Sequence, residues 1–468
     1  MRLAVASRRF GCPWGAINTI ERVIHALILK AFKSRLYPDE EQQAKLAIQF
    51  GHARFVYNAA LELRKEMYFK KDLSINYADC AWFLAQAKDD PQLAWLKDAD
   101  SQVLQQSLMD LDKAYKRFFD LDAKGMLPKL KKPRHDGMPG GYPSTKCKRD
   151  KQSIRYPQRF QFKRTEYNQF VYLPKVGWVQ MVQHRPLKGT AKNVTVSKTK
   201  SGKYFVSVQC EIKTKRKAKP ASSEVGIDLG LKDFATLSTG EKIAPPKPTQ
   251  GMKRRLAIRQ RRLSRKFEAK RHRHWFMDRN KGDNSIKRAT LAVAVTHEKI
   301  ANRRKDFHHQ LSRALVNEFG LIALEDLNVK GMMQNSNLAT SIADAGWAQF
   351  VQFLTYKQAW ANGEIRHVDR FYPSSKTCSC CGAKNSNLKL SDRRWVCPGC
   401  GVIHDRDTNA ALNIVQQATV GATESGLGNQ SNALGHMSLP VGNSAPEQNQ
   451  GIQRYAQLAL FALEAQAL

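Results

Sequence analysis

Five cysteines lie within residues 378–400, and four of them form two pairs with the same spacing. In each pair two residues separate the thiols, which is the spacing of a metal-binding zinc knuckle. Two knuckles supply four thiolates to one tetrahedral ion and leave no open position, so we predict a structural zinc site. Cys380 lies beside the first pair and could compete with Cys381, although the two-residue spacing favours Cys381. The predicted ligands are Cys378, Cys381, Cys397 and Cys400.

Acidic residues stand at the ends of apolar segments that are far apart in the sequence. Asp228 lies in the stretch GIDLG and Glu325 follows the run LIAL, so both are expected at the tips of buried strands. Asp405 and Asp407 lie at the start of a predicted helix, in HDRDTNAALNI. Each acid alone is commonly an ordinary strand or surface residue. Acids that converge from distant positions can instead bind two divalent ions and hydrolyse a phosphodiester.

The charge of the chain indicates a polyanionic partner. The 468 residues include 77 Lys and Arg against 41 Asp and Glu, a formal net charge of +36. Such an excess favours DNA or RNA, whose phosphates it would neutralise with release of counterions. A basic membrane-binding protein is the competing interpretation, but no apolar run approaches the roughly 18 residues of a membrane span. The odd number of cysteines, 9, argues against a secreted disulfide scaffold.

Several basic residues are candidates for phosphate contact, with solvated charge as the alternative. The segment from Lys253 to Arg273 is almost entirely of one sign and contains neither Gly nor Pro, which predicts a long basic helix. The aromatic residues Tyr156, Phe160 and Trp275 could stack on bases, although core packing is the slightly favoured interpretation. The predicted nucleic-acid contacts are Arg54, Lys253, Arg254, Arg255, Arg259, Arg262 and Arg304.

The remaining patterns predict a multidomain α+β protein. Alternating strands at 29–37 and 150–215 predict a small β-barrel, into which the helical stretch 38–149 is inserted. That insertion ends in a basic loop, rich in Gly and Pro, which we expect to be mobile. Residues 1–28 are expected to be an extension, and residues 421–468 a mostly disordered tail.

The motifs GIDLG, ALEDLN, CSCCG…WVCPGCG and HDRDTNAALNI, in this order, resemble the TnpB (OrfB) proteins of bacterial insertion sequences. These are similar to the compact type V CRISPR nucleases. The resemblance extends upstream to KAFKSRLYPDEEQ with ARFVYNAAL, and to IANRRKDFHHQLS. It covers residues 29 to 418 and is specific as a set. Three features depart from the family pattern: the N-terminal extension, the Gly/Pro-rich insert at 133–145 and the extra Cys380.

The resemblance implies a fold and a function. It implies an RNase H-like RuvC nuclease domain, in residues 221–372 and 403–420, interrupted by a zinc ribbon at 373–402. The barrel would be a wedge domain, and its helical insertion a recognition domain with a helix-turn-helix character. The catalytic acids that bind two Mg²⁺ ions map onto Asp228, Glu325 and Asp407, with Asp405 as the reserve for the third position.

The family also implies partners and a location. A guide RNA made from the end of the element would direct cleavage of double-stranded DNA beside a short motif, in the bacterial cytoplasm and at the nucleoid. We expect no membrane association. A non-catalytic regulator of transposition and a strand-joining transposase are the alternatives. The recognised motif, the guide, the oligomeric state and the activity of this copy stay open.

Overall fold

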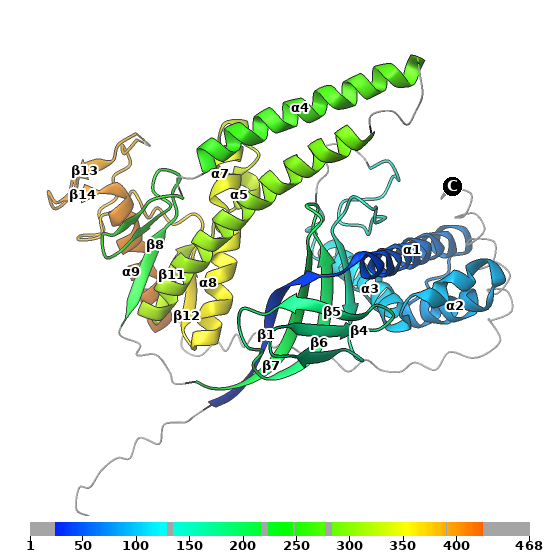
Figure 1. Ribbon diagram of the computed structural model, residues 1–468. Helices are drawn as coiled ribbons and strands as arrows, with labels where there is room; N and C mark the ends of the chain where they lie inside the picture. Colours follow the sequence, from blue (N-terminus) through cyan, green and yellow to red (C-terminus); the bar gives the residue numbers. More distant parts are fainter. Residues whose placement is uncertain are drawn as a thin grey trace, which may run out of the picture.

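The computed structural model describes residues 24–128, 134–216, 223–246, 249–276, 283–389 and 391–424 (Figure 1). Most of the predicted extension and nearly all of the predicted tail therefore lie outside the described residues. None of the described helices is both long and apolar enough to cross a membrane.

The strands of the predicted wedge domain form one antiparallel sheet. Its seven strands follow the order β2-β6-β7-β1-β5-β4-β3. The predicted barrel is an open half-barrel, because the edge strands β2 and β3 do not pair with each other in the described part of the chain. The first strand begins within the predicted extension, where Ile24 pairs with Arg216. The strands are β1 (Ile24–Tyr37), β2 (Gln152–Tyr156), β3 (Gln161–Arg164), β4 (Gln169–Leu173), β5 (Gly177–Val182), β6 (Thr190–Lys198) and β7 (Tyr204–Arg216).

A helical unit is inserted between β1 and β2. Its first helix is capped by Asp39, which accepts a 2.8 Å hydrogen bond from the backbone N–H of Gln42. Phe50 and Val103, from the first and third α-helices, pack into the apolar core of the half-barrel and so join the two units. The helices are α1 (Glu40–Lys71), α2 (Tyr77–Asp89), the 3₁₀ helix η1 (Pro91–Asp98) and α3 (Ser101–Ala123).

The basic Gly/Pro-rich loop is anchored where it is described, from residue 134 onward. Asn58 of α1 exchanges two hydrogen bonds with the backbone of Lys146, at 2.8 and 3.0 Å. The hydroxyls of Tyr115 and Tyr142 lie 3.0 Å apart, which fastens the loop to α3. Polar contacts to two helices thus hold the segment at Tyr142 and Lys146, and its mobility stays a prediction.

A second sheet forms the centre of the other half of the molecule. Its five strands follow the order β10-β9-β8-β11-β12, and the last three are parallel. Gly226 of β8 and Ala323 of β11 are register partners, so these two small residues lie side by side. The strands are β8 (Glu224–Asp228), β9 (Ala235–Leu237), β10 (Lys242–Ile243), β11 (Leu321–Glu325) and β12 (Glu364–Val368).

Helices cover both faces of this sheet. Ile227 and Leu324 share a core with Leu315 and Phe350, which belong to α5 and α8. On the opposite face Ala323 packs against Ile414 of α9. In β8 and β11 large and small side chains alternate along the strand. The large ones fill the core on one face, and the small ones leave the opposite face flat. The helices are α5 (Asp283–Glu318), α6 (Val329–Met332), α7 (Ser336–Ala345), α8 (Trp347–Ala361) and α9 (Arg406–Glu424).

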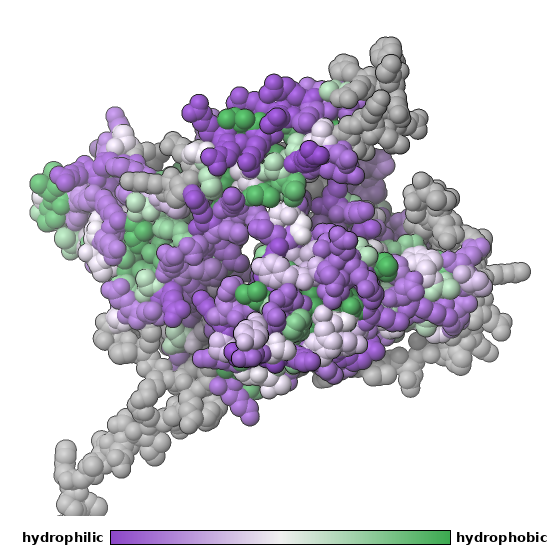
Figure 2. Space-filling view, viewed as in Figure 1, coloured by the Kyte–Doolittle hydropathy of each residue, from purple (hydrophilic) through white to green (hydrophobic). Residues whose placement is uncertain are grey.

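Two appendages extend from this domain. The predicted basic helix is α4 (Thr249–Phe276), which runs beside α5 as a long hairpin (Figure 1). Hydrophilic residues dominate the outer edge of this hairpin (Figure 2). The cysteine-rich segment carries a two-stranded sheet, β13 (Arg394–Val396) and β14 (Ile403–Asp405), and leads directly into α9.

Candidate active site and zinc centre

Three predicted acids come together at one edge of the central sheet. Asp228 ends β8, Glu325 ends β11, and Asp407 lies in the first turn of α9. Leu324 pairs with Ile227, so the parallel register places the two strand-tip acids beside each other. Burial, and then the nearby carboxylates of Glu325 and Asp407, raise the pKa of Asp228 to about 7. Such mutual repulsion is what a bound cation would relieve.

The structure separates the two acids that compete for the third position. Both carboxylate oxygens of Asp405 accept hydrogen bonds from Lys242 Nζ, at 2.8 and 2.9 Å. Asp405 also accepts a 3.1 Å bond from the backbone N–H of Thr408, so it caps α9. Burial opposes ionisation of Asp405, but these partners hold its pKa below the usual value. Asp407 is the acid whose charge acts on Asp228.

Ser374 is a contact of the acid site that sequence reasoning missed. Its hydroxyl donates a 2.6 Å hydrogen bond to Oε1 of Glu325. Ser374 lies between β12 and the first zinc knuckle, and it is buried. The bond fixes one oxygen of the carboxylate and leaves the other for a ligand. Nothing in the spacing of the sequence distinguishes Ser374 from Ser375.

Two buried asparagines of α9 tie the acid site to the zinc-knuckle segment. Asn413 donates from Nδ2 to the carbonyl oxygens of Ser374 and Thr377, at 2.7 and 2.6 Å. Asn409 donates to Thr377 at 2.7 Å and accepts from the backbone N–H of Ser379 at 2.9 Å. Asn409 and Asn413 are four residues apart, so both face the same side of the helix. The helix that carries Asp407 thus also holds the segment that carries Ser374 and Cys378.

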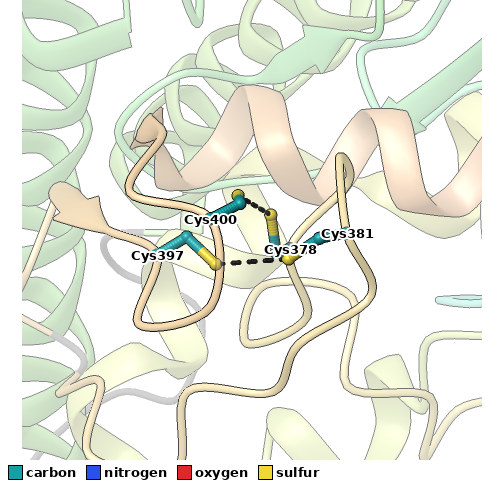
Figure 3. Close-up of side chains that lie close together, drawn as sticks. All are labelled: Cys378, Cys381, Cys397 and Cys400. Carbon is teal, nitrogen blue, oxygen red and sulfur yellow. Dashed lines mark hydrogen bonds between the residues drawn. The ribbon is translucent and has the colours of Figure 1, made fainter.

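The four predicted zinc ligands gather at one point (Figure 3). Their Sγ atoms all lie within 4.8 Å of one another. Cys378 and Cys400 are 3.7 Å apart, and Cys381 and Cys397 are 3.5 Å apart. Four thiols converging in this way fit a tetrahedral zinc ion, for which a Zn–S bond is about 2.3 Å. The donor set leaves no position for substrate.

Cys380 and His404 border this cluster. The Nε2 atom of His404 lies 3.0 Å from the Sγ of Cys378, and the buried imidazole packs against Trp395. Cys378, Cys380 and His404 form a second group of ligand atoms within 4.8 Å of one another. Cys380 therefore lies close enough to compete for a metal ion, as its position in the sequence indicated. An N–H donor at Nε2 would stabilise the Cys378 thiolate.

Several predicted nucleic-acid residues make contacts within the protein. Arg259 donates 3.0 and 2.5 Å hydrogen bonds to Ala292 O and Thr296 Oγ1, which holds α4 against α5. Lys253 forms an ion pair with Asp344. These contacts give the side chains structural roles.

The other nucleic-acid candidates range from side chains that are bonded or buried within the protein to side chains that are exposed. Arg304 donates a 2.7 Å bond to the carbonyl of Ala343, and Arg54 approaches Gln152 at 3.5 Å. Tyr156 is fully buried in the half-barrel core, so core packing is the correct interpretation for it. Trp275 lies in helix α4, but its side chain is outside the described residues. The exposed candidates on α4 are Arg254, Arg255 and Arg262.

Comparison with known families assigns most of these parts. A profile described as "Helix-turn-helix domain" matches residues 28–71, and one described as "Probable transposase" matches residues 207–336. A third, "Cas12f1-like, TNB domain", matches residues 347–414 and includes all four clustered cysteines.

Full-length relatives identify the class. A protein of Streptomyces pristinaespiralis, named as an RNA-guided DNA endonuclease, is 37% identical over 83% of this chain and 89% of its own length. InsQ of Escherichia coli K12, named likewise, is 33% identical over 83% of this chain and 92% of its own length. These matches show that the chain belongs to a class of proteins found in insertion sequences. The chain belongs to the TnpB (OrfB) family.

Among solved structures, a Cas12f1–sgRNA–target DNA complex matches with a TM-score of 0.47 and 16% identity, over 83% of this chain and 99% of that chain.

Proposed function

We propose that this protein is an RNA-guided, metal-dependent endonuclease of a mobile element, which cleaves double-stranded DNA beside a short motif. The observation that carries the proposal is the convergence of Asp228, Glu325 and Asp407 in a chain of this family. The relatives that cover nearly the same length are named as RNA-guided DNA endonucleases. With this substrate, the protein would act on the DNA of a bacterial cell.

The three carboxylates form a metal site of the kind that hydrolyses phosphodiesters. Two divalent ions bound there, most simply Mg²⁺, would supply an activated water and stabilise the leaving oxygen. The charges of both other acids act on Asp228, so it would be the ligand shared by the two ions.

Neighbouring residues orient the acids. Ser374 restrains one oxygen of Glu325, and Arg393 lies 3.4 Å from Asp407. The guanidinium groups of Arg393 and Arg406 also lower the pKa of Asp228, against burial and the other two acids. These cations would meet the phosphates of a DNA strand entering the site.

The two sheets and the ribbon would have separate roles. We assign residues 221–372 and 403–420 to a RuvC-like nuclease domain, 373–402 to a structural zinc ribbon, and 29–37 with 150–215 to a wedge domain. The helical unit 38–149 would contact nucleic acid through surfaces such as that of Arg54. The exposed arginines of α4 would hold the backbone of the guide RNA or its heteroduplex, while base pairing with the guide reads the target.

The test is a guided cleavage reaction. The protein is purified with its copurifying RNA, that RNA is sequenced, and a plasmid carrying the matching target is incubated with Mg²⁺. We expect double-strand cleavage at the matched site and none in an Asp228→Ala variant. No bound RNA and no cleavage would overturn the proposal. Cleavage that survives Asp228→Ala would overturn the site, and joined strands would indicate a transposase.

A further inference from the structure

An exposed aromatic side chain stands beside the acid site without a role in packing. Phe371 has 86% of its surface exposed, a value matched among the described large hydrophobic residues by Tyr167 alone. It follows β12, which ends at Val368, the register partner of Glu325. A phenyl ring so exposed contributes little to the core, so its faces are open to a ligand.

The turn that carries Phe371 is defined by hydrogen bonds. The backbone N–H of Phe371 donates to the side chain of Asp369 at 2.8 Å, and that of Tyr372 donates to the Asp369 carbonyl at 3.1 Å. Tyr372, the next residue, packs with the core on the α9 side of the sheet. A side-chain cap of this kind orders a turn without help from the residue at its tip. The ring is therefore presented outward by a fixed backbone.

Both ends of this turn are fastened to the strand that carries Glu325. Arg370 donates to Asp326 twice, from Nη2 to the carboxylate at 2.6 Å and from Nε to the carbonyl at 3.0 Å. On the other side Ser374 donates to Glu325 at 2.6 Å. Three residues of chain span at most about 11 Å, so Phe371 stands close to the carboxylates.

We propose that Phe371 is a stacking platform for an unpaired base of the DNA strand that is being cut. The inference rests on the proposed endonuclease function and adds that a base near the scissile phosphate lies on this ring. Aromatic faces stack on every base, so the contact is tolerant of sequence. That tolerance is what a cutting site needs when the guide supplies specificity.

The charges around the turn suit a single strand. Arg393 and Arg406 act on the acid site from the ribbon and α9, whereas the guanidinium of Arg370 is paired with Asp326. A strand that lies between the ring and these cations would have its bases on the aromatic side and its phosphates on the charged side.

The direct test uses the full-length protein with its guide RNA. A single-stranded DNA oligonucleotide carries 2-aminopurine next to the mapped cut position, and an Asp228→Ala background keeps it intact. We expect quenching of 2-aminopurine with Phe371 and with Phe371→Tyr. Quenching should be lost in Phe371→Leu and Phe371→Ala. Leu keeps apolar bulk without an aromatic face, so it separates stacking from general burial.

Cleavage of matched plasmid provides the second readout. In the otherwise native protein, Phe371→Ala and Phe371→Leu should slow cleavage by roughly 5- to 150-fold, the usual range for loss of one stacked base, and Phe371→Tyr should restore it. The control is Tyr167→Ala, an equally exposed aromatic on the β3–β4 turn. Its removal should leave the 2-aminopurine signal unchanged.

The outcomes separate this proposal from the function on which it rests. A native protein that cuts no guided target overturns the proposed function. A native protein that cuts, while Phe371→Ala cuts and quenches equally well, overturns the stacking role alone. Loss of quenching in Tyr167→Ala would overturn it too. A change in oligomeric state in Phe371→Ala with quenching intact would also overturn the stacking role, because the ring would then be a contact between protein chains.

Discussion

Gly226 of β8 lies so close to Ala411 of α9 that a β-carbon on residue 226 would overlap the carbonyl oxygen of Ala411. Gly226 is two residues from Asp228, and Ala411 is four residues from Asp407. The absence of a side chain therefore sets the distance between the strand and the helix that carry two of the three acids. Ala323, the register partner of Gly226, continues the same flat surface.

Gly226→Ala should disrupt this contact. We expect a loss of stability of about 1–3 kcal/mol, because the helix must move outward, and a larger relative loss of cleavage. Urea unfolding and plasmid cleavage measure the two effects. Gly251→Ala is the matched control, since nothing lies within 4 Å of that position in α4. Equal effects of the two substitutions would contradict the role of close packing.

Asp407 and Asp405 should separate when each is changed to Ala. Asp407→Ala should reduce cleavage by at least about 100-fold with little change in stability, because the residue acts on bound metal. Asp405→Ala should reduce stability by about 0.5–2 kcal/mol through loss of the cap of α9, with a smaller effect on cleavage. Cleavage rates and urea unfolding of both variants measure this. The opposite ranking would make Asp405 the third acid.

Ser374→Ala should weaken the binding of catalytic metal without releasing zinc. Removing its hydroxyl frees the Glu325 carboxylate to rotate, and loss of such supporting hydrogen bonds reduces affinity or activity about 10- to 100-fold. The measurement is cleavage against Mg²⁺ concentration, together with the zinc content of the purified protein. Ser375→Ala, the adjacent serine, is the control. An unchanged Mg²⁺ dependence would show that the hydroxyl does not position Glu325.

The acid cluster should make the Mg²⁺-free protein sensitive to pH. Burial, and then the carboxylates of Glu325 and Asp407, raise the pKa of Asp228 from 3.8 to about 7. The folded state thus binds this proton more tightly, so the stabilising contribution is present below pH 3.8 and is lost as the pH rises through about 7.

Asp228→Asn should therefore gain stability relative to the native chain between pH 5 and pH 8, by up to about 4 kcal/mol. Thermal unfolding of zinc-loaded, Mg²⁺-free protein across this range measures the difference. Added Mg²⁺ should stabilise the native chain and not the variant. A difference that is constant with pH would contradict the assigned repulsion.

Substitution of single cysteines should distinguish the zinc ligands from Cys380 by the zinc content of each variant. Cys381→Ser should release zinc, while Cys380→Ser should retain one ion per chain, because the Sγ of Cys381 belongs to the four-thiol group. Metal analysis of the purified variants decides this. Zinc loss should also reduce cleavage, since Asn409 and Asn413 link the knuckle segment to the helix of Asp407. Zinc loss from Cys380→Ser would show that the extra cysteine is a ligand.

The sequence predicted those parts of the site that have a local signature. Paired thiols at fixed spacing identify knuckles, and an acid after an apolar run identifies a strand tip, so Asp228, Glu325 and the four cysteines could be named without a structure. Asn409 and Asn413 could not, because a buried asparagine looks like a surface one until its partners are known. The hydrogen bonds by which Arg259 joins two helices were equally hidden from the sequence.

The sequence also did not show that the half-barrel is open. Alternating residues predict strands and their buried faces, but they do not show whether the edge strands β2 and β3 pair with each other. The start of β1 at Ile24 also escaped prediction, because pairing with the long strand β7, and not local pattern, extends it.

The position of α9 after the zinc ribbon has a consequence for the order of synthesis. A chain that emerges from its N-terminus can form the half-barrel, the helical unit and the α4–α5 hairpin before Asp407 has been made. Until α9 docks on Gly226, the nascent protein can hold nucleic acid on its basic surfaces but lacks one of its three acids. The set of three acids is thus completed only after the basic surfaces have been made.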